Sequence, residues 1–388
     1  MIKSMTITIT ELDDEQLAVQ QLLSQLNLEK DLMKHSICII ACHYEFVLSG
    51  VFKAVSKALP FDVVGSISSA QSVPDTTDFL LMTLLVLTSD DVEFDIAITE
   101  SIISEQGPKQ AIKDCYNSKV RKDIKPAMIF AFAAFLVQNC GDDYVTTLSE
   151  ISGNVPCFGT IAVDDTYDFK NCFVLSNGEH YHDKLAMILF YGDIRPKFFV
   201  ANISESKIIG PGAVITKSAG PVLMEVNGHP VIEYLSDLGL GEASESQYAM
   251  ANLPLLLDYN DGSPMVSKIL VMLTEDKSVI CAGAMPLDST LHIAKCDSED
   301  VMFTTGQALQ SIINEIGNAS TLLVYTCISR NMALGSDHFK EMELVREKTQ
   351  GKITFLMANS GGEICPTQVS DDKAINRFHN NAFVACLF

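Results

Sequence analysis

Residues 321–335 read TLLVYTCISRNMALG, and residues 353–367 read ITFLMANSGGEICPT. The apolar, β-rich runs at 321–326 and 353–357 predict two strands, and the charged segment 338–348 between them predicts a helix. Polar and small residues follow each predicted strand, with Arg330 after the first and Gly362 and Glu363 after the second. In an open α/β sheet this edge is where ligands bind. The region therefore predicts an α/β unit with a candidate site at its strand ends.

Two earlier segments have the same shape. Strands are predicted at 36–41 and 61–65 around a helix at 48–59, and at 128–137 and 155–159 around a helix at 142–149. The second strand of each unit ends in small residues, as in VVGSIS (63–68), VPCFGT (155–160) and FLMANSGG (355–362). This weak internal similarity predicts an α/β (mixed α+β) fold of repeated strand–helix units, with mixed sheets flanked by helices.

Further elements extend this pattern over the chain. Helices are expected at 13–26 and 305–316. The Asn177-Gly178 dipeptide predicts a hairpin that joins strands at 172–175 and 185–191, because Asn-Gly favours two-residue hairpin turns. Segments 79–87 and 92–98 are expected to be neighbouring strands or a strand that leads into a helix. Additional strands are expected at these places: 198–203, 268–273, 279–282 and 382–387. The polar segment 241–247 (GEASESQ) is expected to be a loop.

Composition excludes several classes of function. The chain has 388 residues, of which 47% are hydrophobic, and its net charge is −22. This much apolar sequence argues against disorder. The negative charge argues against nucleic acid and anionic membranes as partners, because both are bound through Lys and Arg. The apolar runs at 79–87 and 127–137 are too short to span a membrane, which takes about 20 residues.

The eleven cysteines do not indicate a disulfide framework. Their number is odd, their spacing is irregular, and no Cys-x-x-Cys occurs. Most lie in apolar strings, where Cys behaves as a small hydrophobic residue, so reduced thiols in the cytoplasm are expected. No metal-binding spacing of Cys and His is present, and His180 and His182 are expected to lie on a solvated hairpin edge. No metal site is therefore predicted.

Arg330 and Glu363 have three possible roles at this stage. They could form a salt bridge across the strand ends. They could hold the two ends of a zwitterionic ligand, with the Arg fork on a carboxylate and the Glu on an amine. Alternatively, Arg330 ties down a loop and Gly361-Gly362 makes a tight turn.

At these residues the sequence resembles the FIST family. TCISRNMALG (326–335), NSGGEICP (359–366) and FHNNAF (378–383) resemble the Cys-x-x-Arg, Gly-Glu-Ile and His-Asn pattern of the FIST C-terminal domain. VVGSISSA (63–70), VPCFGTIAVDD (155–165) and SNGEHYHDKLAMILF (176–190) resemble parts of the FIST N-terminal domain, and residues 215–240 resemble the junction. The resemblance covers about 36–388. It implies a lead-in at 1–35, an N-terminal domain at 36–226 and a C-terminal domain at 227–388.

The resemblance implies a sensory protein of signal transduction in the cytoplasm. Its ligand would be a small, amino-acid-like molecule, and with no readable output module it would act on a signalling partner in trans. Some relatives bind haem and sense nitric oxide, so haem is the alternative cofactor, and the cofactor stays unknown. The residues that the resemblance places at the ligand are Arg330, Glu363, Gly362, Cys327, His379, Asn380, Gly65 and Ser66.

Two other functions stay open. No activated nucleophile or acid–base pair is evident, so no catalytic residue is predicted. If the chain is nevertheless an enzyme, it is a cysteine-dependent hydrolase or transferase in which Cys365 or Cys327 is the nucleophile and His379 the base. A structural interaction module would instead expose an apolar face and lack a pocket.

Overall fold

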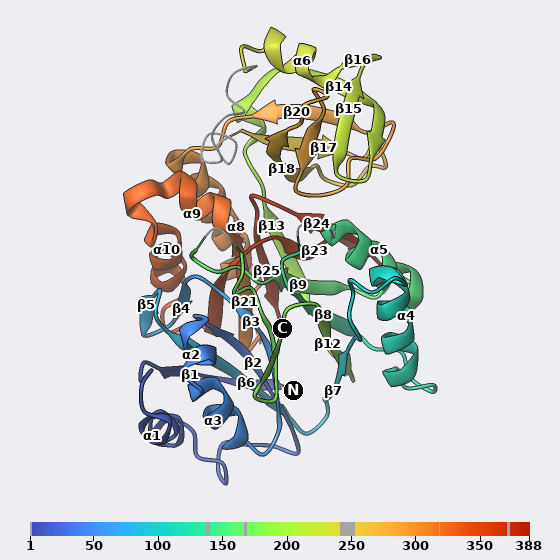
Figure 1. Cartoon of the computed structure of the whole chain (residues 1–388). Coiled ribbons are helices and arrows are strands. Elements are labelled where there is room, and N and C mark those ends of the chain that lie inside the picture. Colours follow the sequence, from blue (N-terminus) through green and yellow to red (C-terminus); the bar gives the residue numbers. More distant parts are fainter. Residues whose placement is uncertain (1, 137–139, 167–168, 241–252, 318, 371–372) are drawn as a thin grey trace.

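The computed structural model describes residues 2–136, 140–166, 169–240, 253–317, 319–370 and 373–388, and these form three six-stranded sheets and a seven-stranded barrel (Figure 1). The mixed α+β class with strand–helix units is therefore confirmed.

The three six-stranded sheets share one plan. In each sheet, an edge strand pairs antiparallel with a second strand, and the second pairs antiparallel with a third. The third and fourth strands are parallel. A hairpin from elsewhere in the chain then pairs antiparallel with the fourth strand. In this order, the first sheet contains β1 (Ile2–Ile9), β6 (Met82–Ser89), β2 (His35–Cys42), β3 (Asp62–Ile67), β10 (Val174–Ser176) and β11 (Glu179–Tyr181). The second contains β7 (Glu93–Ile98), β12 (Leu185–Tyr191), β8 (Met128–Ala133), β9 (Cys157–Ile161), β23 (Glu363–Ser370) and β24 (Lys373–His379). The third contains β13 (Lys197–Ala201), β25 (Phe383–Leu387), β21 (Thr321–Cys327), β22 (Thr354–Ser360), β4 (Gln71–Val73) and β5 (Thr76–Asp78).

Helices connect the parallel strands and cover the outer faces of the sheets. The connections are α2 (Glu45–Leu48) with α3 (Val51–Lys57) in the first sheet, α5 (Gly141–Ser152) in the second, and α9 (Ile328–Leu334), η3 (Gly335–Asp337) and α10 (Lys340–Thr349) in the third. Three more helices pack beside them: α1 (Glu15–Gln25) on the first sheet, α4 (Gly107–Lys119) on the second and α8 (Ser298–Glu315) on the third. Parallel strands buried on both faces read as continuous apolar runs, which explains MIFAFA at 128–133.

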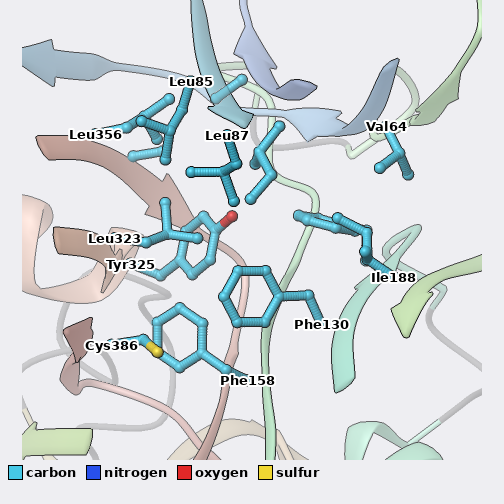
Figure 2. Packing of buried hydrophobic residues seen from close by; sticks show 14 of the residues in the cluster. Val64, Leu85, Leu87, Phe130, Phe158, Ile188, Leu323, Tyr325, Leu356 and Cys386 are labelled. Atoms are coloured by element: carbon cyan, nitrogen blue, oxygen red, sulfur yellow. The ribbon is translucent and has the colours of Figure 1, made fainter. Parts of the chain in front are cut away.

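The inner faces of the three sheets meet in one hydrophobic core. Val64 and Leu85 from the first sheet, Phe130 and Phe158 from the second, and Tyr325 from the third all belong to it (Figure 2). Because side chains alternate along a strand, every second residue points into this core and the others pack under the helices. The alternation fixes which residue of each strand end faces the centre.

The seven-stranded barrel is built from the middle of the chain. Its strands follow the order β14 (Ile208–Ala219), β20 (Thr290–Ala294), β17 (Pro254–Asp258), β18 (Val266–Leu273), β19 (Val279–Cys281), β15 (Val222–Val226) and β16 (His229–Pro230), and pairing of β14 with β15 closes it. Helix α6 (Val231–Asp237) packs on the barrel, and the 3-10 turn η1 (Glu205–Lys207) leads into it. Figure 1 shows the barrel beyond the ends of β23 and β24. It takes strands from both sides of residue 227, where the domain boundary stays a prediction.

The predicted hairpin is wrong in one strand. The Asn177-Gly178 turn is present, with φ of 50° and 82°, but it joins β10 to β11. The strand at 185–191 is β12, which pairs with β7 and β8 in the second sheet. Asn-Gly specifies a tight turn, so it joins β10 to the strand that follows directly. The strand at 185–191 comes only after a further connection. The predicted loop at 241–247 lies outside the described residues.

The eleven cysteines are all free, as expected from their spacing. No described helix has the length and apolar character needed to cross a membrane.

Candidate functional site

The carboxyl ends of the three parallel strand pairs place three hydroxyl residues at equivalent positions. Ser66, Thr160 and Ser360 are the last core-facing residues of β3, β9 and β22, and their parallel partners are Ala41, Phe132 and Cys327. The Thr160 hydroxyl donates a 2.7 Å hydrogen bond to Ser360 Oγ, which also accepts from the Gly362 N–H at 3.1 Å. This contact joins the ends of the second and third sheets.

Backbone hydrogen bonds tie the same strand ends together. Val163 N–H donates to the Ile67 carbonyl at 3.3 Å, Gly361 N–H to the Ile161 carbonyl at 2.8 Å, and Asn359 N–H to the Ala70 carbonyl at 3.0 Å. The first bond links the second sheet to the first, and the other two hold the segments that cross from one sheet to another. The segments that follow the three strands therefore form a closed junction at this end of the core.

Glu363 supplies a buried carboxyl group to this junction. It begins β23, pairs with Thr160 of β9, and is fully buried. No hydrogen bond of ordinary geometry reaches either of its carboxylate oxygens. Burial raises the pKa of Glu363 well above its usual value, although the Ser360 hydroxyl, the Ala382 N–H and the Cys327 thiol lie close enough to oppose the rise. Burial therefore favours the protonated form of this carboxyl group, which can both donate and accept a hydrogen bond.

His379 lies directly opposite Glu363 at the end of β24. Its Nε2 is 3.1 Å from the Cys365 carbonyl oxygen, which can only accept, so the proton is on Nε2 and Nδ1 presents a lone pair. Burial lowers the pKa of His379 to about 4, and Nδ1 has no partner. Asn380, the next residue, also keeps its side-chain oxygen unpaired. The junction thus presents several buried acceptors that have no hydrogen bond of ordinary geometry.

Arg330 is not the partner of Glu363. It is fully buried, and its Nε and Nη2 donate to Glu341 Oε1 of α10 at 3.0 and 2.8 Å. Nη2 also donates to Thr305 Oγ1 of α8 at 2.7 Å. The salt bridge with Glu363 that the sequence suggested is therefore wrong, because a second carboxylate, on the helix after Arg330, reaches it first. One donor, Nη1, has no partner, and the charge of Arg330 still acts on Glu363.

The two candidate nucleophiles are thiols in the neutral form. Burial raises the pKa of Cys327 to about 12, with a contribution from Glu363, and raises that of Cys365 well above its usual value. The reactive form of Cys is the thiolate, which neither residue supplies at neutral pH. His379 contacts the backbone of Cys365 and not its sulfur. These observations disfavour cysteine catalysis.

The glycines predicted at the ligand have packing roles. A Cβ at Gly65 would lie 1.8 Å from the Ile40 carbonyl oxygen, so the β2–β3 pairing requires glycine. A Cβ at Gly362 would lie 2.4 Å from the Phe378 ring. Ser66 faces the core in the first sheet. The structure thus brings Cys327, Glu363, Gly362, His379 and Asn380 together at the junction of the second and third sheets.

Thr160, Glu341 and Asn381 were missed by sequence reasoning. Thr160 had a signal, because Gly159-Thr160 repeats Gly65-Ser66 at the end of the equivalent strand. No sequence signal distinguished Glu341 from the other residues of its predicted helix. Asn381 accepts from the Cys296 thiol at 3.5 Å, a contact between residues 85 positions apart. Such contacts depend on chain crossings that no local pattern encodes.

Haem does not fit these residues. An axial ligand needs a cavity of porphyrin size beside it, whereas His379 is fully buried between β23 and its neighbours. Two cavities that open at the surface lie elsewhere. One of about 490 Å3 is lined by residues 56, 57 and 59–62 with Asn177, and one of about 650 Å3 by residues around Pro74 and α10. In the part of the chain that the structure describes, no three His, Cys, Asp or Glu side chains gather as a metal site.

Known proteins resemble the chain at two levels. Among solved structures, cyanuric acid hydrolase from A. caulinodans matches with 10% identity and a TM-score of 0.37, covering 100% of this chain and 99% of that one. A chorismatase matches with 8% identity and a TM-score of 0.38, covering 100% and 98%. Similarity this low says nothing about activity. A comparison with curated proteins gives no match.

Family models give the decisive match. The FIST N domain matches residues 36–229 and the FIST C domain matches residues 231–366, which together span most of the chain. The Cys-x-x-Arg, Gly-Glu-Ile and His-Asn segments that meet at the junction all carried the resemblance in the sequence. The chain therefore belongs to the FIST family, whose domains sense ligands in signal transduction.

Proposed function

We propose that this protein is a sensor that binds a small, amino-acid-like ligand at the junction of the second and third sheets. The supporting observation is a concentration of buried polar atoms without partners: both oxygens of Glu363, Nδ1 of His379, the side-chain oxygen of Asn380 and Nη1 of Arg330. Leaving such an atom unpaired costs about 1–3 kcal/mol, so each one in a folded protein needs an explanation. A ligand that pairs with them supplies one.

The chemistry of these atoms indicates the polarity of the ligand. Glu363, His379 and Asn380 offer acceptors, which suit the N–H groups of an amine. Arg330 offers one remaining donor, which suits a carboxylate oxygen. An amino acid carries both groups. Arg330 contributes less than the sequence suggested, because Glu341 already holds two of its nitrogens.

The location and partner follow from the family and the composition. We infer a cytoplasmic protein, because reduced cysteines persist in that compartment. Signalling would pass to another protein in trans. The net charge of −22 favours a partner other than nucleic acid or an anionic membrane.

A thermal-shift screen tests the proposal. The twenty L-amino acids are added singly to the wild type, to Glu363→Gln and to Glu343→Gln, whose side chain lies exposed on α10. A ligand at 100 times its Kd adds about 2.7 kcal/mol of stability. We expect one or a few amino acids to raise the Tm of the wild type and of Glu343→Gln by a few degrees, and to act much less on Glu363→Gln. If no amino acid raises the Tm, or Glu363→Gln responds like the wild type, the proposal fails.

A further inference from the structure

A buried ion pair fastens the barrel to the rest of the protein beside the candidate site. Lys268 of β18 is fully buried, and its Nζ lies 2.9 Å from both carboxylate oxygens of Asp142 in α5. Nζ also donates to the Phe378 carbonyl at 2.8 Å. Phe378 directly precedes His379, so one ammonium group connects the barrel, helix α5 and the strand end that carries the site.

The surroundings of this pair are built to hold it. Asp142 Oδ2 also accepts the Ala284 N–H from the barrel at 2.7 Å. A Cβ at Gly283 would lie 2.7 Å from Lys268 Nζ and 2.8 Å from Asp142 Oδ2, so glycine leaves the room that the two charges occupy. Burial opposes the charged lysine, but Asp142, with smaller contributions from Tyr259 and Cys140, raises the pKa of Lys268. The three N–H groups of the Lys268 ammonium therefore all have acceptors.

The same face of the barrel covers the site. Asn380 N–H donates to the Ser267 carbonyl at 3.0 Å, and Leu256 of β17 packs with Val301 of α8 and Leu334 of α9. Glu363, His379 and Arg330 have no exposed surface at all. A molecule of any size reaches them only after a covering element moves.

We propose that the barrel is a lid over the candidate site, and that the Lys268–Asp142 ion pair is the latch that keeps it closed. This inference rests on the proposed function for its purpose, since the lid would admit and retain the ligand. The role of the Lys268–Asp142 ion pair in holding the barrel closed does not depend on a ligand. Breaking one partner of a buried pair leaves an uncompensated charge, which costs several kcal/mol and is relieved when water enters.

Hydrogen exchange of single amides tests the latch on the full chain without ligand. The N–H groups of Asn380 and Ala284 report the closed lid, because both bond across it. The N–H of Ile129, bonded to the Pro156 carbonyl within the second sheet, reports the core. The variant is Lys268→Met. The matched control is Lys217→Met, which removes a solvent-exposed ion pair with Glu225 between two strands of the barrel.

We expect Lys268→Met to speed exchange at Asn380 and Ala284 at least tenfold, with Ile129 unchanged, and Lys217→Met to change none of the three. Lys268→Met/Asp142→Asn, which carries no unpaired charge and keeps an acceptor for Ala284, should return both rates toward wild type. If Lys268→Met does not fold, Asp142→Asn replaces it, because it removes the charge of the other partner, and it must then exchange faster than wild type at Asn380 while Ile129 stays protected. Unchanged rates at Asn380 and Ala284, or acceleration of Ile129 by the same factor, would overturn the latch. If no amino acid raises the Tm but the exchange rates change as predicted, the proposed function fails and the latch is still supported.

Discussion

Glu363 and His379 face each other as a directly opposed pair on β23 and β24, both without exposed surface, and their pKa values move in opposite directions. Burial raises the pKa of Glu363 well above its usual value and lowers that of His379 to about 4. Burial therefore favours the neutral form of both groups. A cationic ligand group beside Glu363 would oppose this effect of burial, because a nearby positive charge favours the ionised carboxylate.

The carboxyl group of Glu363 should make the protein less stable as pH rises. Its pKa is higher folded than unfolded, so above about 4.3 the folded state binds more protons than the unfolded state. The contribution is fully present below that pH and is lost as pH approaches the folded pKa, by at most about 1.4 kcal/mol per pH unit. Glu363→Gln should remove this slope and equal or exceed the wild type in stability at pH 8. Urea unfolding at pH 5, 6, 7 and 8 measures the effect. A wild-type slope that Glu363→Gln leaves intact would contradict it.

His379 should have the opposite effect on the acid side. Its folded pKa of about 4 lies below the unfolded value of about 6.5, so the unfolded state binds more protons between them. Stability is therefore lost as pH falls from about 6.5 to 4, a window in which the Glu363 contribution has the reverse sign. His379→Gln keeps a donor for the Cys365 carbonyl and should flatten the acid-side slope. The measurement is urea unfolding of both proteins at pH 4.5, 5.5 and 6.5, and equal slopes would show that His379 is not buried in its neutral form.

Arg330 and Glu341 should each be needed for stability, in contrast to Glu363. Glu341 accepts from Arg330, from Thr305 and, at 2.6 Å, from Thr326. Glu341→Gln leaves Arg330 buried and unpaired, which should cost about 3–5 kcal/mol. Arg330→Met/Glu341→Gln should recover part of the loss, since no charge then stays unpaired. Chemical denaturation checks both. If Glu341→Gln costs less than about 1 kcal/mol, the pair is not the anchor of α9 and α10.

Gly159 should tolerate no side chain. A Cβ there would lie 1.9 Å from the Ala131 carbonyl oxygen, as one at Gly65 would lie 1.8 Å from that of Ile40. Gly159→Ala forces β8 and β9 apart and should cost about 3 kcal/mol or more. The control is Gly306→Ala in α8, where a Cβ meets nothing within 4 Å and alanine should add up to about 1 kcal/mol. A thermal unfolding comparison in which both variants behave alike would refute the close approach.

Much of the fold was predictable because its strands are apolar and its helices periodic. Strands at 36–41, 321–326 and 353–357 and helices at 13–26 and 338–348 were confirmed as β2, β21, β22, α1 and α10. The barrel was largely missed, since β14 mixes exposed and buried residues along its length. The short hairpin strands β4 and β5 were missed because three residues carry no periodicity.

The candidate site was predictable in position and not in pairing. Strand ends and glycines indicated where polar groups gather, and the FIST segments named most of them. The partner of Arg330 was not predictable. Glu341 lies in the next predicted helix and Glu363 follows the next predicted strand, and the sequence gives no way to choose between these two carboxylates. The pairing of β23 with β9 of the second sheet brings Glu363 beside Thr160. These residues lie 203 positions apart, so no local sequence pattern predicts their contact.

Isothermal titration calorimetry with the most stabilising amino acid tests the central claim, that Glu363 receives the amine of a ligand. Titrations of the wild type, Glu363→Gln and Glu343→Gln are run at pH 7 in two buffers with different ionisation enthalpies. We predict that the wild type and Glu343→Gln bind with release of up to one proton, and that Glu363→Gln binds at least tenfold more weakly without releasing it. Equal affinity of Glu363→Gln and the wild type would contradict the claim.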